Sequence, residues 1–134
     1  MNKIKCFAPI SNKCPHILHG GDYNPEHWLN TPEIWDEDLR LMQMTKCNVM
    51  TLGIFSWSML ELKEGFFEFE WLDKIMDKLS RNGVFVVLAT PSGSKPAWLS
   101  ELYPEVCRVN MQGIREKHQN RHNHCRTSPV YREK

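Results

Sequence analysis

The chain has 134 residues, of which 41% are hydrophobic and 10% aromatic, and its 17 basic side chains nearly balance 16 acidic ones. This composition is typical of a folded globular domain and excludes a disordered polyelectrolyte. No uncharged apolar run approaches the roughly 18 to 20 residues of a membrane span, and no apolar stretch follows the N-terminal lysines as in a secretory signal, so we expect a cytoplasmic protein.

The cysteines favour the same compartment. Cys6, Cys14, Cys47, Cys107 and Cys125 are odd in number and contain no CxxC pair. We therefore expect reduced thiols and no disulfide framework.

The first predicted element is a strand over residues 17–24, an apolar stretch bounded by turn residues. A helix is predicted next, with Thr31 as its N-cap and Pro32 at its first position. Its apolar face consists of Trp35, Leu39 and Met42, spaced i, i+4 and i+7. Asn48 is the predicted left-handed residue that ends this helix.

The alternation of strand and helix continues. A second strand is predicted over 49–55, a helix over 70–81 that stops at Asn82 and Gly83, and a third strand over 84–91. The apolar face of this helix consists of Leu72, Ile75, Met76 and Leu79. The third strand, VFVVLATP, is continuously apolar, which predicts burial on both faces, as in a parallel sheet.

The order strand, helix, strand, helix, strand predicts an α/β fold with a parallel sheet. Beyond it we expect a short helix over 97–102, a polar segment over 109–128, and a helical turn over 130–134 that begins after Ser128-Pro129. Two architectures fit: the first three units of a (β/α)8 barrel, which is complete at about 250 residues, or a small flavodoxin-like sheet, which needs about five strands.

In such folds the functional residues follow the carboxyl ends of the strands. The side chains at these positions are Asp22, Tyr23, Asn24, Glu26, His27, Trp28, Ser56, Trp57, Ser92, Lys95 and Trp98. Each strand is thus followed by a tryptophan, whose flat indole could stack on a sugar ring or belong to the core. Trp35 and Trp71, on the predicted helices, are expected in the core.

Carboxyl groups are the candidates for glycoside hydrolysis, which uses a pair of them across the scissile bond. Glu26 in NPEHW is the best candidate, although a carboxylate here could equally organise neighbouring loops. Asp22 is a further candidate, and Glu61 and Glu64 lie in the polar stretch LELKEG and are expected to be solvated. No convincing acid and nucleophile pair is present.

A basic segment over 117–126 gathers three histidines, Cys125 and two arginines. His118 and His122, at i and i+4, could bind zinc, although the spacing matches no standard zinc finger. The local positive charge could also attract phosphate or RNA, but interleaved aromatic residues are missing. As a third alternative, Arg121 could hold substrate hydroxyls as a planar clamp with several donors.

These motifs together resemble the N-terminal part of glycoside hydrolase family 42, the bacterial β-galactosidases. The resemblance rests on GGDYNPEHW (20–28), IWDEDLRLM (34–42), the stretch NVMTLGIFSWSMLELKEGFFEFEW to KPAWL (48–99), YPEV (103–106) and RHNHCRTSPVYRE (121–133). It extends over nearly everything from Leu18 onward. Residues 1–17 are then an N-terminal extension, and 18–134 the N-terminal part of the barrel domain, ending before strand four.

The resemblance implies a retaining β-galactosidase that hydrolyses terminal β-D-galactosyl residues, and that assembles as a homo-oligomer, often a trimer. Both catalytic glutamates of the family follow later strands, so the fragment should lack them and be inactive alone. Arg121 matches the arginine that binds the galactosyl unit. Cys125 matches one of four zinc thiolates found in some members, and no other cofactor is implied.

The resemblance implies neither a nucleic-acid nor a membrane partner. An alternative function class remains open at this point, namely a mature, non-catalytic module that binds carbohydrate or nucleic acid.

Overall fold

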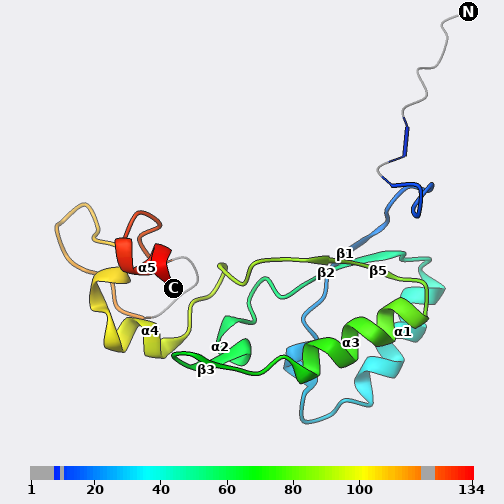
Figure 1. The fold of residues 1–134 in the computed structure, drawn as a ribbon, viewed down its shortest axis with the longest axis horizontal. Coiled ribbons are helices and arrows are strands. Elements are labelled where there is room, and N and C mark those ends of the chain that lie inside the picture. The colour runs from blue at the N-terminus through cyan, green and yellow to red at the C-terminus, as the bar shows by residue number, and fades with distance from the viewer. Residues whose placement is uncertain (1–7, 10, 119–122) are drawn as a thin grey trace, which may run out of the picture.

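A three-stranded parallel sheet organises the first part of the computed structural model, which describes residues 8–9, 11–118 and 123–134. Its strands are β1 (Gly20–Asp22), β2 (Val49–Leu52) and β5 (Phe85–Leu88), in the spatial order β1-β2-β5 (Figure 1). Val49 pairs with Gly20 on one side and with Phe85 on the other. The predicted α/β fold with a parallel sheet is confirmed, although the strands are shorter than predicted.

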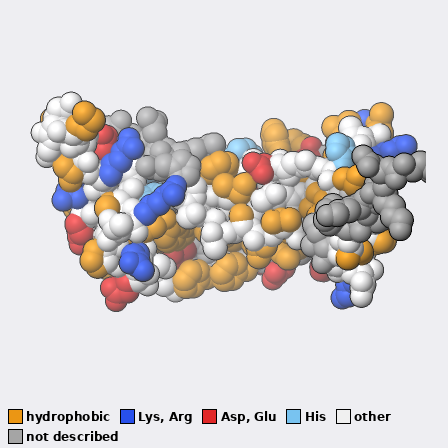
Figure 2. Space-filling view, turned by 90° about the horizontal axis from the view of Figure 1, so that it is seen from above, with side chains coloured by type: hydrophobic (Ala, Val, Ile, Leu, Met, Phe, Trp, Pro, Cys, Tyr) orange, Lys and Arg blue, Asp and Glu red, His pale blue; other side chains and the backbone are white. Residues whose placement is uncertain are grey.

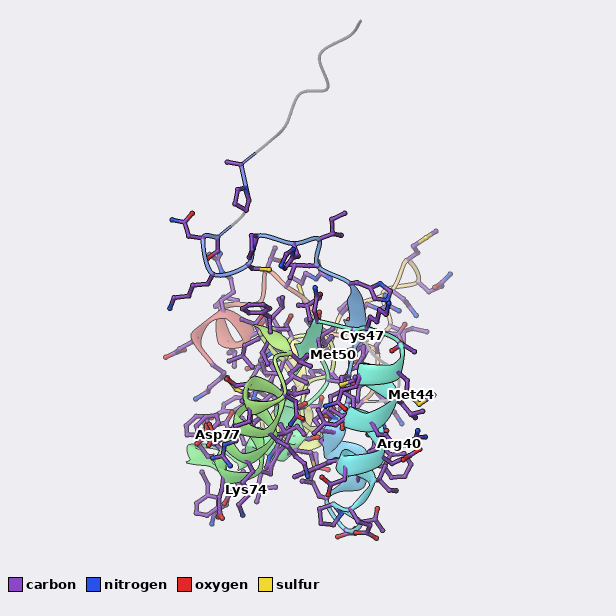
Figure 3. The ribbon with its side chains drawn as sticks, turned by 90° about the vertical axis from the view of Figure 1, so that its right-hand side faces the viewer. Arg40, Met44, Cys47, Met50, Lys74 and Asp77 are labelled. Atoms are coloured by element: carbon purple, nitrogen blue, oxygen red, sulfur yellow. The ribbon has the colours of Figure 1, made fainter. Side chains whose placement is uncertain are left out.

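Two helices cover one face of this sheet. They are α1 (Ile34–Met44) and α3 (Glu70–Arg81), which lie side by side beneath the sheet (Figure 3). The predicted apolar faces pack into the core, where Leu52, Ile75 and Leu79 have no exposed surface. Arg40 and Met44 lie on the outer side of α1, and Lys74 and Asp77 on the outer side of α3.

The ends of α1 differ from the prediction. Thr31 and Pro32 form a preceding turn through their carbonyls, so the helix begins at Ile34. The left-handed residue after the helix is Lys46, with a φ of 57°, and Asn48 was the wrong choice. The Asn48 side chain instead accepts a hydrogen bond from the His19 amide at 2.7 Å and donates one to the Ile17 carbonyl at 2.9 Å. It thereby fixes the chain that leads into β1.

The segment between β2 and α3 is more ordered than the predicted polar loop. It contains the short helix α2 (Trp57–Leu60) and an antiparallel hairpin of β3 (Glu61–Lys63) and β4 (Phe66–Phe67). Gly65 provides the turn with a φ of 74°. The helix α3 then begins and ends as predicted, and Gly83 follows it with a φ of 73°.

The second face of the sheet carries no helix among the described residues (Figure 1). Met50 and Leu52 of β2 point toward the helices and are buried, whereas Phe85 and Val87 of β5 are 41% and 50% exposed. Figure 2, which views the molecule from this side, shows hydrophobic side chains along its middle. The prediction that β5 is buried on both faces is therefore wrong for this chain.

The last part of the chain packs around a second, smaller apolar cluster. It contains α4 (Ala97–Leu102), which matches its prediction, the 3-10 turn η2 (Pro104–Val106) and α5 (Pro129–Glu133). Leu99 and Val106 are fully buried at its centre. Ser128 caps α5 as predicted, since its hydroxyl accepts a hydrogen bond from the Tyr131 amide.

The four cysteines that the structure describes, Cys14, Cys47, Cys107 and Cys125, are all free thiols. Within the described ranges, no helix is both long enough and apolar enough to cross a membrane.

Candidate functional site

The loops that follow β2 and β5 lie at the same edge of the sheet, as the parallel order requires. Between them lies a hollow of about 380 Å³. Its lining contains both aromatic and charged side chains, among them Trp57, Phe67, Phe69, Tyr131, Glu61 and Lys134. A hollow of aromatic rings with charged groups beside it suits a ligand with both apolar and hydroxyl-bearing faces, such as a sugar.

Glu61 is a structural part of this region, and the expectation that it is solvated is wrong. Only 6% of Glu61 is exposed. Its carboxylate accepts hydrogen bonds at 2.8 Å from the Trp57 indole and at 2.8 Å from the Gly65 amide. The Trp98 indole donates to the Glu61 carbonyl at 3.0 Å. Glu61 therefore holds two of the three tryptophans that follow the strands, joining α2, the hairpin and α4.

Of these three tryptophans, Trp57 lines the hollow, and Trp28 is 40% exposed on the 3-10 turn η1 (Pro25–Trp28). Trp35 and Trp71 are core residues, as expected, at 7% and 8% exposure.

Glu26 and Asp22 do not form a catalytic pair. Neither carboxylate oxygen of Glu26 has a hydrogen-bond partner within the part of the chain that the structure describes, although both are buried. Asp22 is exposed at the end of β1. In this region the Tyr23 hydroxyl donates a hydrogen bond to Asp38 at 2.8 Å. Burial raises the pKa of Tyr23 above its ordinary value.

Glu64 anchors the C-terminal helix to the hairpin. It accepts hydrogen bonds from the Tyr103 hydroxyl at 3.0 Å and pairs with the Lys134 ammonium. The bond from Lys134, followed by that from Tyr103, holds the pKa of Glu64 below its ordinary value. Glu64 is exposed, as expected from its polar stretch, but the sequence did not indicate either partner.

A carboxyl with a lowered pKa stabilises its contact above its unfolded pKa, and the contact is lost as pH falls through the folded value. Glu64→Gln at neutral pH should therefore reproduce the effect of acidification, lowering the amide-exchange protection of α5 by up to about fivefold, the scale of an exposed ion pair. Hydrogen exchange read by mass spectrometry checks this. Glu70→Gln, which breaks only the Lys74 pair on α3, is the control and should leave α5 unchanged. Equal protection of α5 in both variants would contradict the anchor.

Lys95, which the sequence places among the residues that follow the strands, is buried, and the sequence did not indicate its partners. It follows β5 and is only 4% exposed. Its ammonium donates to the Asn123 side-chain oxygen at 2.7 Å and lies 3.4 Å from His118 Nδ1, which is itself 3.2 Å from the Ser100 hydroxyl. Burial lowers the pKa of Lys95, opposed by the thiol of Cys107. The polar segment thus folds back onto the carboxyl edge of the sheet through Lys95.

The two residues carried over from the family resemblance have different outcomes. Arg121 lies outside the described residues, as does His122. The Cys125 thiol lies 3.2 Å from the Thr127 hydroxyl, and this hydrogen bond lowers the pKa of Cys125, which favours the thiolate that metals bind.

The described residues alone do not fit a zinc centre. No three histidine, cysteine or acidic side chains gather in a metal-binding cluster within the described ranges. The polar contacts of His118 are with Lys95 and Ser100, whereas the thiol of Cys125 contacts Thr127. Since a structural zinc needs four ligands, Cys125 could supply only one of them.

Parallel strands joined by helices, with aromatic and carboxylate side chains near the carboxyl edge, are the arrangement of β/α folds, of which the barrel is one type. The comparison with protein families gives a more specific assignment than the fold does. The chain belongs to glycoside hydrolase family 42, the β-galactosidases, whose family model matches residues 22–134.

Individual relatives agree with this assignment. The chain is 56% identical over 131 residues to β-galactosidase Pbg of Clostridium perfringens, covering 98% of this chain and 19% of that protein. It is 54% identical over 118 residues to β-galactosidase GanA of Bacillus subtilis, covering 88% of this chain and 18% of that protein. The chain therefore spans about a fifth of the length of the curated relatives it matches.

Solved structures confirm the fold. The β-galactosidase of Rahnella sp. R3 superposes with a TM-score of 0.89 at 51% identity, covering 92% of this chain and 18% of that one. The β-galactosidase of Bacillus circulans sp. alkalophilus superposes with a TM-score of 0.88 at 39% identity, covering 93% of this chain and 18% of that one. The parallel sheet described above thus matches the N-terminal region of these enzymes.

Proposed function

We propose that this chain forms the first three β/α units of the catalytic barrel of a retaining β-galactosidase, which hydrolyses terminal β-D-galactosyl residues by double displacement. The observation that carries the proposal is the family match over residues 22–134, together with a parallel sheet in the order β1-β2-β5. The aromatic hollow at the carboxyl edge gives physical support, because such surfaces bind sugar rings.

Within this proposal, the chain contributes binding and architecture, and both catalytic glutamates come from later strands. Arg121 would donate hydrogen bonds from its planar guanidinium to galactosyl hydroxyls. One face of the sheet carries no helix among the described residues, and this supports a role as part of a larger barrel, since parallel sheets are normally covered on both faces.

Three further properties belong to the proposal. Cys125 would provide one thiolate to a structural zinc, and the lowered pKa of its thiol supports this. The complete enzyme would be a homo-oligomer, often a trimer in this family, with no nucleic-acid or membrane partner. The free thiols of the described cysteines support a cytoplasmic location.

A chimaera tests the function. In it, the 134 residues of this chain replace the matching segment of the Clostridium perfringens relative, a swap that the 56% identity favours. We expect the chimaera to hydrolyse a chromogenic β-galactoside and the isolated chain to show no turnover. A chimaera that folds but is inactive, or that prefers another glycoside, would refute the proposal.

The aromatic hollow also favours a second candidate, a non-catalytic carbohydrate-binding module. Calorimetric titration of the isolated chain with a β-galactoside separates the two. Saturable sugar binding by a monodisperse, cooperatively unfolding chain would support the module, whereas an aggregated or molten chain would support the barrel section.

A further inference from the structure

A buried amine and a buried thiol are neighbours in the part of the chain that follows β5. Lys95 is 4% exposed and Cys107 is 3% exposed. The Cys107 thiol is not in a disulfide, and it is hydrogen-bonded to the Lys95 side chain. Both groups are nucleophiles, so they do not react with each other until one of them is oxidised. Oxidation of the sulfur is therefore the event that would allow a bond between them.

One short stretch of the chain fixes the positions of both residues. The Asn123 side-chain oxygen accepts a hydrogen bond from the Lys95 ammonium at 2.7 Å. The next residue, His124, forms an antiparallel bridge with Cys107, and the Asn123 carbonyl accepts from the Arg108 amide at 3.0 Å. The head group of Lys95 and the backbone of Cys107 are thus held against the same two residues. The contact between amine and thiol is therefore part of the fold.

A hollow of about 300 Å³ borders this pair, and its lining includes Cys107, Ser100 and His118. His118 is exposed, and its Nδ1 atom lies 3.4 Å from the Lys95 nitrogen and 3.2 Å from the Ser100 hydroxyl. Because part of the lining is exposed, the hollow opens to solvent. Its volume exceeds that of several water molecules, each of which occupies about 30 Å³ in the liquid. A molecule as small as hydrogen peroxide can therefore enter it.

The surroundings of Lys95 favour the form of its amine that can react. An amine attacks sulfur through its lone pair, which the protonated form lacks. Burial lowers the pKa of Lys95 below its ordinary value, and the Cys107 thiol opposes this effect. At neutral pH the neutral fraction of Lys95 is therefore larger than that of an exposed lysine such as Lys74, which is paired with Glu70.

We propose that Lys95 and Cys107 are a site of oxidative cross-linking, in which hydrogen peroxide oxidises the Cys107 thiol to a sulfenic acid and the Lys95 amine then bonds to the sulfur. In the first step the O–O bond breaks, an S–O bond forms, and the thiol proton leaves in a molecule of water. The sulfur loses two electrons, which the peroxide gains. In the second step the nitrogen lone pair forms an S–N bond while the S–O bond breaks. The departing oxygen takes one amine proton and leaves as water.

The product is a sulfenamide that joins the loop after β5 to the residue after η2, on either side of α4. An external thiol reverses the bond, because its thiolate attacks the Cys107 sulfur and the Lys95 nitrogen leaves with a proton. The mixed disulfide that results is reduced by a second thiol. This modification is independent of the galactosidase function proposed above.

The test treats the chimaera with hydrogen peroxide and reads the products by mass spectrometry after digestion without reductant. We expect a cross-linked peptide pair that contains Lys95 and Cys107 and lacks one hydrogen atom from each of the two side chains. Dithiothreitol should separate the pair. Since the mass of the peptides is the readout, the result does not depend on whether the chimaera hydrolyses a galactoside.

Lys95→Arg is the matched variant, because a guanidinium keeps the positive charge but is not a nucleophilic amine at neutral pH. We expect the cross-linked pair to be lost in this variant, with Cys107 recovered as the sulfinic acid instead. Lys74→Arg, the same change at an exposed site on α3, should leave the cross-link unchanged. If Lys95→Arg fails to fold, Lys95→Met serves in its place. Should both fail, the measurement on the unsubstituted chimaera still decides, since it detects the bond itself.

Three results would overturn the cross-link. One is Cys107 recovered as a sulfinic acid beside an unmodified Lys95 in the unsubstituted, folded chimaera. A second is Cys107 that stays reduced at a peroxide dose that oxidises the less buried thiol of Cys125. The third is a cross-linked product of Cys107 that persists in Lys95→Arg, which would show that another group reacts with the sulfur.

Discussion

Replacing Gly20 by alanine should separate β1 from β2 and lower the free energy of unfolding by at least about 3 kcal/mol, at the upper end of overpacking effects. A Cβ atom at Gly20 would lie 1.6 Å from the Val49 carbonyl oxygen and 2.8 Å from its carbon. These are backbone atoms of the strand that pairs with Gly20, so they cannot move aside without breaking the register. The β1 strand would have to leave the sheet.

The chain offers a matched control for this change. At Gly21, the next residue in β1, an added Cβ meets no atom within 4 Å. Urea unfolding of the chimaera, followed by tryptophan fluorescence, should therefore show a much lower midpoint for Gly20→Ala and a nearly unchanged one for Gly21→Ala. Similar midpoints for the two variants would show that β1 does not pair with β2 as described.

Arg121→Ala should lower kcat/KM of the chimaera for a β-galactoside roughly 30- to 150-fold, which corresponds to about 2 to 3 kcal/mol for a lost charged hydrogen bond. The physical reason is that a guanidinium presents several donors in a fixed plane, and alanine leaves the sugar hydroxyls without them. Steady-state kinetics with a chromogenic β-galactoside, together with galactose inhibition, measure the loss.

Arg126→Ala is the matched control for this prediction, because it removes an exposed arginine from the same basic segment. It should leave kcat/KM within about twofold, as expected for a surface change. A loss of similar size in both variants would show that the segment acts through its overall positive charge, and no individual role for Arg121 would remain.

The sequence predicted the elements whose signals are local. The helix α3 was located to its final residue because its apolar spacing continues to Leu79, after which Asn82 and Gly83 end the pattern. The helix α4 and the cap at Ser128 were found for the same reason. In each of these cases the deciding residues lie within a few positions of one another.

The parts of the site that were missed depend on distant partners. The position of Lys95 after a strand made it a candidate, but its burial depends on contacts with residues 23 and 28 positions away. Likewise, the Glu61 carbonyl accepts a hydrogen bond from the Trp98 indole, which is 37 positions away. Such contacts leave no periodic signal in the sequence.

The apolar pattern of β5 indicates what the strand needs to bury, but not which segment covers it. Val86 packs against the core formed with α1 and α3, and on the opposite face Phe85 and Val87 remain exposed. The sequence predicted burial on both faces, but the described residues provide a covering layer for only one.

The order of the sheet has a consequence for folding during synthesis. In this sheet β2 pairs with β1 and with β5, and the paired residues are 29 and 36 positions apart (Gly20 with Val49, Val49 with Phe85), so the loops to be closed are of moderate length. The contacts that join the sheet and its two helices therefore all lie within this segment. At the rates of translation, any later segment that covers Phe85 and Val87 arrives seconds afterwards. During that interval Phe85 and Val87 stay exposed, and we expect a charged residue in place of Val87 to reduce chaperone binding to the nascent segment.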